Sequence, residues 1–284
     1  MHELVKIAMR GPFQAIALAS ITMLIPLMFW FSAAVVALVT LRKGFQQGAV
    51  VFFWTALPAM VWLWSLQDPG PLIVLVMAFL MASILRVTIS WQTTLVAGAL
   101  VGIILGWAAP FLMPDVIQML NELTDQFFRE LAKQSEQEYT DELRVGFESL
   151  MVAGFVSSFY GVAIGSLCLA RSWQAKLFNP GGWQEEFFQI RIQPKLLIAA
   201  LMLLVVAPAL GMNASVVMLT VAVALIFAGI ALVHGLIARK NMTKQWLVGF
   251  YLSVVLLFPT VLVLVVIAAA LDSLIDFRSR VSSS

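Results

Sequence analysis

The sequence has few charged residues, only two histidines and a single cysteine. Of its 284 residues, 11% are charged and 62% are hydrophobic, whereas an ordinary soluble domain has about 25% charged and about 45–50% apolar residues. The mean hydropathy is +0.97. One soluble core of this size could not enclose so much apolar surface, but a lipid bilayer can surround it. The composition therefore predicts an integral membrane protein in contact with the lipid bilayer, and it excludes a soluble enzyme.

Residue types that serve catalytic and metal sites are also scarce. The lone cysteine, Cys168, cannot form an intramolecular disulfide, and the two histidines, His2 and His234, lie far apart in the chain. The sequence has no H-E-x-x-H motif, no Walker loop, no G-x-G-x-x-G fingerprint and no cluster with zinc-ligand spacing. The net charge is only +2, so nothing indicates a nucleic-acid partner. We expect no enzyme activity, no cofactor and no metal.

The sequence has long apolar runs instead. They lie near residues 13–25, 27–41, 45–66, 71–90, 92–113, 147–170, 195–211, 214–238 and 246–275. A spanning helix needs about 20 apolar residues, and its backbone groups are satisfied within the helix itself. Because the runs are continuous rather than alternating, they predict an all-α polytopic bundle of about eight or nine apolar helices. The whole chain, residues 1–284, reads as a single membrane domain.

The basic residues indicate an orientation, because cytoplasmic loops are enriched in Lys and Arg. Pro26 separates the first two runs, which form either a helical hairpin or one long kinked helix. A hairpin with the N-terminus inside places most of the 17 basic residues inside, whereas a single crossing would place them outside. We favour the hairpin. The last run is long and contains Pro259, so the side of the C-terminus stays open.

Residues 115–146 form an acidic segment between two apolar runs, which suits an external loop. Its apolar residues recur every three or four positions and share one helix face. They are Val116, Leu120, Leu123, Phe127 and Leu131. The segment therefore predicts an amphipathic helix that lies on the outer membrane surface or caps the bundle. A lid over a substrate site is the functional alternative.

Two apolar runs carry small residues at four-residue spacing, a pattern that lets membrane helices approach closely. One stripe consists of Gly98, Gly102 and Gly106, and the other of Ala153, Ser157, Gly161 and Gly165. The two runs flank the acidic segment, so they are antiparallel, and we expect both stripes to pack against neighbouring helices.

Arg86 is the clearest charge within an apolar run, and Ser83 and Ser90 lie close to it in the sequence. Burying a charge in lipid costs at least about 2.5–3.5 kcal/mol. Arg86 therefore either reaches back to the membrane interface or faces the bundle interior and pairs with an acid or an anionic ligand. These three residues are the candidate substrate-binding residues.

Asp272 and Asp276 close the last apolar run, beside Arg278 and Arg280. They either cap the helix at the membrane interface or pair with a buried base.

The loop over residues 171–195 carries the most structured polar motif. Asn179-Pro180-Gly181-Gly182 is a strong turn signal, since proline restricts one dihedral angle and glycine reaches conformations closed to other residues. Glu185 and Glu186 follow, where acids suit the first turn of a helix, and Arg191 comes later. The segment is either a tight turn that leads into an interfacial helix, or a gate or docking site for a cytoplasmic partner.

Three segments resemble the YybS-like family of bacterial membrane proteins. They are residues 32–44, residues 178–191 with the Asn-Pro-Gly-Gly turn, and residues 271–278. That family is grouped with the S-components of energy-coupling-factor transporters, which capture a vitamin or metal on the outer side. The resemblance implies a coupling membrane subunit and ATPase subunits as partners, although this chain has more apolar runs than an S-component.

The leading hypothesis is a bacterial inner-membrane protein, with its N-terminus in the cytoplasm, that binds or helps to move a small solute through an S-component-like core. The alternative is a non-transporting scaffold or regulatory protein that acts through the loop at residues 171–195.

Overall fold

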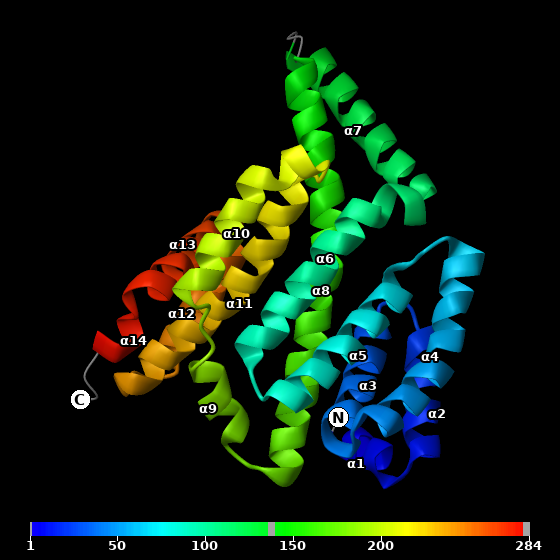
Figure 1. Cartoon of the computed structure of the whole chain (residues 1–284), viewed down its shortest axis with the longest axis vertical. Helices are drawn as coiled ribbons and strands as arrows, with labels where there is room; N and C mark the ends of the chain where they lie inside the picture. Colours follow the sequence, from blue (N-terminus) through cyan, green and yellow to red (C-terminus); the bar gives the residue numbers. More distant parts are fainter. Residues whose placement is uncertain (1, 136–139, 281–284) are drawn as a thin grey trace.

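A computed structural model describes residues 2–135 and 140–280 of the chain (Figure 1). Every regular element within these ranges is a helix, which confirms the expected all-α fold. Glu136 and Glu138 of the acidic segment lie outside the described residues, as does the side chain of His2.

The helices follow one another with short connections. The first half of the chain forms α1 (His2–Arg10), α2 (Pro12–Leu24), α3 (Phe29–Lys43), α4 (Phe45–Leu66), α5 (Gly70–Thr88) and α6 (Trp91–Leu112). The second half forms α7 (Pro114–Ser135), α8 (Asp141–Phe178), α9 (Gly182–Phe188), α10 (Pro194–Val206) with the 3-10 turn η1 (Ala207–Leu210), α11 (Ala214–Arg239), α12 (Gln245–Leu256), α13 (Thr260–Ile275) and α14 (Phe277–Arg280).

Among the described residues, five helices are long and apolar enough to cross a bilayer, namely α4, α5, α6, α8 and α11. This indicates a membrane-embedded protein. Shorter apolar helices are α2, α10 with η1, α12 and α13. The predicted run 246–275 is divided in two, because α12 ends at Leu256 and α13 begins at Thr260, directly after Pro259.

The first two apolar runs form a helical hairpin, α2 and α3, that turns around Pro26. The Ser32 hydroxyl donates to the Ala19 carbonyl at 2.7 Å and lies 2.6 Å from the Thr22 hydroxyl. These hydroxyl groups are buried and satisfy one another within the protein, as an apolar surrounding requires. The two helices have 13 and 15 residues, fewer than the about 20 needed for a full crossing.

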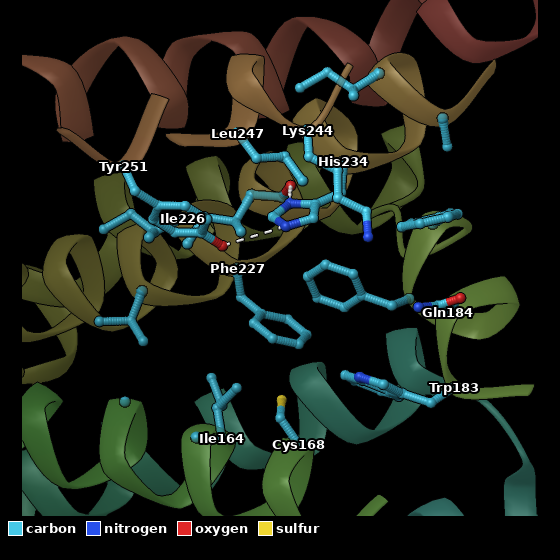
Figure 2. A pocket seen from close by; sticks show the side chains of 18 of the residues that line it. Ile164, Cys168, Trp183, Gln184, Ile226, Phe227, His234, Lys244, Leu247 and Tyr251 are labelled. Atoms are coloured by element: carbon cyan, nitrogen blue, oxygen red, sulfur yellow. Dashed lines mark hydrogen bonds between the residues drawn. The ribbon is translucent and has the colours of Figure 1, made fainter. Parts of the chain in front are cut away.

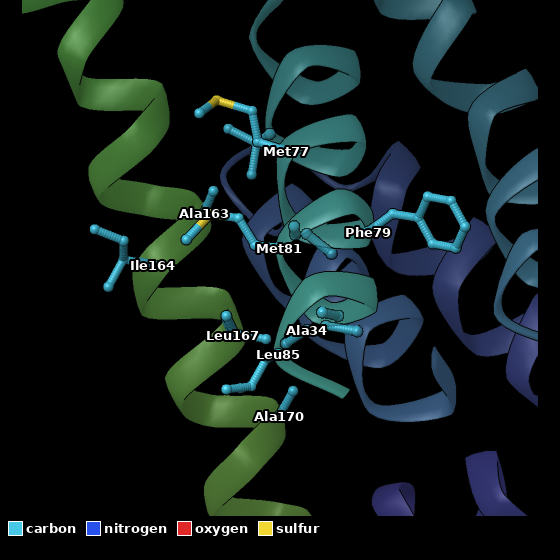
Figure 3. Close-up of a cluster of buried hydrophobic side chains, with 14 of the residues drawn as sticks. Ala34, Met77, Phe79, Met81, Leu85, Ala163, Ile164, Leu167 and Ala170 are labelled. Carbon is cyan, nitrogen blue, oxygen red and sulfur yellow. The ribbon is translucent and has the colours of Figure 1, made fainter. Parts of the chain in front are cut away.

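The apolar core lies where α3, α5 and α8 meet (Figure 3). Ala34 of α3, Met81 and Leu85 of α5, and Leu167 and Ala170 of α8 face one another there. Alanine side chains at this junction let the backbones approach closely, which is how helices associate in lipid. Longer side chains fill the remaining space.

The amphipathic helix α7 packs along the beginning of α8 rather than across the end of the bundle. The Phe127 ring stacks on Phe147 with centroids 5.3 Å apart, and Arg144 forms an ion pair with Asp125. Helix α8 has 38 residues, or about 57 Å at roughly 1.5 Å per residue. It is therefore much longer than the other helices, and the α7–α8 pair projects beyond the bundle (Figure 1). The ion pair with Arg144 balances one carboxylate of the acidic segment.

The glycine stripe of α6 lies against α8 and α11. A Cβ atom at Gly98 would lie 2.6 Å from Cε2 of Tyr160, one at Gly102 would lie 3.1 Å from Cγ2 of Thr220, and one at Gly106 would collide with Val216. The Tyr160 ring is held in place because its hydroxyl donates to the Leu95 carbonyl at 2.7 Å.

We expect Gly98→Val to lower the free energy of unfolding by about 1–3 kcal/mol, because the added side chain overfills a closely packed contact. Thermal or denaturant unfolding of the purified protein in detergent measures the effect. Gly154→Val on α8 is the matched control, since a Cβ there meets nothing within 4 Å. Equal losses in the two variants would contradict the prediction.

Candidate functional site

A groove of about 770 Å³ runs between α8, α9, α11 and α12 (Figure 2). Its walls are mostly apolar, with Ile164 of α8 and Val223 and Phe227 of α11 among them. Its polar lining residues are Gln184 of α9, His234 near the end of α11, Lys244 just before α12 and Tyr251 within α12. The groove therefore has apolar walls on α8 and the middle of α11, and polar groups among the residues of its other walls.

His234 and Tyr251 form a polar pair on the groove wall (Figure 2). Nδ1 of His234 lies 2.9 Å from the Ile230 carbonyl, which can only accept a hydrogen bond. In the neutral ring the proton therefore sits on Nδ1, and Nε2 is the acceptor. The Tyr251 hydroxyl lies 3.4 Å from this Nε2 and donates to it. The hydroxyl oxygen remains able to accept a hydrogen bond from a ligand.

The Asn-Pro-Gly-Gly turn places α9 as one wall of the groove. Gly181 has a φ of +91°, in the left-handed region that favours glycine, and α9 begins at the next residue. Two aromatic side chains of α9, Trp183 and Phe187, then line the groove. Trp183 packs against Trp91 and against Phe187, both with ring centroids 5.2 Å apart. The turn is thus part of the groove.

The small-residue stripe of α8 lies in two different surroundings. The Ser157 hydroxyl lies 3.0 Å from the Thr220 hydroxyl on α11, so this part of the stripe packs between helices. Gly161 and Gly165 line the groove instead, and a Cβ at Gly165 would meet nothing within 4 Å. Cys168, the only cysteine, lines the groove one turn farther along.

The candidate residues around Arg86 are not brought together. Ser83 donates to the Phe79 carbonyl of its own helix at 2.8 Å, and the Ser90 hydroxyl caps α6 by accepting from the Thr93 amide at 3.2 Å. Arg86 is exposed at the end of α5 and donates to the Leu41 carbonyl of α3. It lines a second cleft, of about 380 Å³, which neither serine lines.

Half of the six charged residues of the 171–195 loop form ion pairs within the chain. Glu186 forms an ion pair with Arg171 of α8. Arg191 donates from Nε to the Asp272 carbonyl at 2.9 Å and forms an ion pair with Asp276 at 2.7 Å. Glu185 remains exposed, as do Asn179 and Pro180. Glu186 and Arg191 thus hold the fold together, whereas the charges of Glu185, Lys176 and Lys195 are exposed.

Arg278 lies buried beneath the loop that leaves α9. Its NH1 and NH2 groups donate to the Phe188 and Ile190 carbonyls at 2.7 and 2.8 Å, and its Nε lies 3.6 Å from Asp272. Arg278 is 5% exposed and Asp272 is 2% exposed. Burial lowers the pKa of the Arg278 guanidinium, whereas Asp272 acts in the opposite direction. Asp272 is therefore the partner of a buried base, and it also accepts a hydrogen bond from the Phe277 amide at 2.9 Å, just past the end of α13.

No family model, curated protein or solved structure matches this chain. The functional interpretation therefore depends on the geometry of the groove and of the polar contacts around it.

We expect Arg278→Met to reduce the free energy of unfolding by about 3–5 kcal/mol, because the Asp272 carboxylate would stay buried without its partner. Unfolding in detergent measures the loss, and the exposed Arg280→Met is the control. The double variant Arg278→Met with Asp272→Asn should recover part of the stability. A single variant as stable as the control would refute the assignment.

Proposed function

We propose that this chain is a multi-pass membrane protein that binds an amphiphilic molecule in the groove between α8, α9, α11 and α12. One observation carries the proposal: the groove is apolar along Ile164, Val223 and Phe227, and its hydrogen-bonding side chains come from the other walls, on α9, α12 and the end of α11. Such a distribution matches a ligand with an apolar chain and a polar head group.

The lining argues for an amphiphile over a fully polar solute. A polar molecule placed along the apolar walls would lose its hydrogen bonds to water without replacing them, which is costly. An acyl or isoprenoid chain has no hydrogen bonds to lose there, so the apolar walls can replace the lipid tails around it without that cost. The His234–Tyr251 pair and Lys244 would then hold the head group by hydrogen bonds and charge. Transport, with ATPase subunits as partners, is a further part of the proposal and rests on the resemblance to S-components alone.

The alternative, a scaffold that acts through residues 171–195, has less support. Glu186 and Arg191, two of the three charged residues of its motif after the turn, are engaged in ion pairs within the chain. Glu185 is the exposed one. A partner would therefore have few charged groups of the motif to bind.

We also propose that the end of the bundle with Arg42, Arg171 and Arg239 faces the cytoplasm of a bacterial cell, as the enrichment of cytoplasmic loops in Lys and Arg predicts. The N-terminus then lies inside, and α7 with the beginning of α8 lies outside.

Thiol labelling tests this orientation. In a Cys168→Ser background, Thr140→Cys should react with a membrane-impermeant maleimide in right-side-out vesicles, and Lys240→Cys only in inside-out vesicles. Both positions are exposed and lie near opposite ends of α8 and α11. The reverse pattern would overturn the orientation without affecting the groove.

Photo-crosslinking tests ligand binding. The purified protein in nanodiscs, exposed to a long-chain fatty acid that carries a diazirine, should form adducts that peptide mapping assigns to the groove walls. Gly165→Leu should weaken this labelling by about tenfold, because fitting the ligand beside the added leucine side chain costs roughly 1–3 kcal/mol of overpacking.

Gly154→Leu is the matched control for this experiment, since it makes the same change on the same helix and also meets open space. It should leave the labelling as in the unchanged protein. Adducts spread evenly over lipid-facing helices, or equal labelling of the two variants, would refute the proposal.

A further inference from the structure

The second cleft, which we call the arginine cleft, gathers charge where four helices end or meet. It has a volume of about 380 Å³ and lies between α3, α5, α8 and α9. Its lining residues are Leu41, Arg42, Leu85, Arg86, Ile89, Arg171, Gln174 and Glu186. Three arginines thus face one cleft that contains a single carboxylate.

That carboxylate, Glu186, is already paired with Arg171. Arg171 donates to both oxygens of Glu186, with Nε to Oε2 at 2.9 Å, and its NH1 donates to Oε1 of Gln174 at 3.0 Å. The Trp91 indole also approaches Oε2, at 3.4 Å. Arg171 and Glu186 therefore neutralise each other and form a fixed polar wall.

The other two arginines have no acidic partner among the described residues. Arg86 uses NH1 for the Leu41 carbonyl, which is a neutral acceptor, and its remaining N–H groups have no hydrogen-bond partner there. The Arg42 guanidinium lies 4.0 Å from the Phe178 ring centroid. This stacking orients the guanidinium plane but leaves its hydrogen-bond donors free. The cleft consequently carries two uncompensated positive charges with unused donors.

We propose that the arginine cleft binds a phosphate group. A phosphate offers two to three acceptor oxygens and a charge that balances Arg42 and Arg86, and guanidinium groups bind it in a two-pronged manner. Basic pockets between helices near the cytoplasmic side of a membrane are suited to the phosphate head groups of anionic lipids. A water-soluble phosphate compound would use the same chemistry. This site is separate from the groove and does not depend on what the groove binds.

The experiment uses the full chain and two phosphate sources. Thermal unfolding is measured in nanodiscs of phosphatidylglycerol and of phosphatidylcholine, and in detergent with inorganic phosphate or pyrophosphate, and native mass spectrometry counts retained lipid. We expect phosphate to raise the melting temperature of the unchanged protein. Arg42→Gln with Arg86→Gln should weaken the binding by at least about tenfold, because both charged donors are lost.

The control is Arg10→Gln with Arg280→Gln, which removes the same charge from two other exposed arginines. Arg42→Gln alone is a second test variant that should fold normally, because Arg42 makes no hydrogen bond to a backbone group among the described residues. This single variant should also weaken phosphate binding. Selective stabilisation and retention of phosphatidylglycerol would identify a lipid head group, whereas stabilisation by inorganic phosphate or pyrophosphate would identify a soluble compound. No stabilisation by either source, or equal effects in the cleft and control variants, would overturn the proposal.

Discussion

A polar group that leaves water must find its partner within the protein, and this constraint governs the arrangement of the helices. In a bilayer no solvent is present to complete a missing hydrogen bond. Ser32 and Thr22 satisfy each other across the α2–α3 hairpin, and the Tyr160 hydroxyl donates to a backbone carbonyl of α6. The largest case is Arg278, which donates to the Phe188 carbonyl at the end of α9 and to the Ile190 carbonyl just after it, while Asp272 balances its charge.

These contacts explain why the groove has a defined shape. Helix α9 has only seven residues and none of them is buried, so a helix of this length would not be stable alone. It is held at two places, by Arg171 through Glu186 and by Arg278 through the Phe188 carbonyl. The aromatic rings of Trp183 and Phe187 are thereby kept along the groove.

The sequence predicted the all-α fold and the long apolar helices, but not how many of them are long enough to cross a bilayer and not their partners. Long apolar runs specify helices because hydrocarbon leaves a single chain segment few other ways to satisfy its backbone. The two small-residue stripes look alike in sequence, yet Gly98 packs against Tyr160 while Gly165 lines a groove. The difference depends on which residue the fold places opposite each glycine. The sequence also does not show that Asp272 pairs with a buried arginine. Its partner Arg278 is held by hydrogen bonds to carbonyl groups that lie about 90 positions away in the chain.

The groove and the arginine cleft lie on either side of α9, since Phe187 lines the groove and the adjacent Glu186 lines the cleft. Shared walls alone do not couple two sites, because coupling requires an element with two positions that each ligand favours differently. The ion pair with Arg171 and the hydrogen bond from Arg278 hold α9 in one position in the structure. The two sites are therefore adjacent but have different linings: mostly apolar walls in the groove, and two arginines without an acidic partner among the described residues in the cleft.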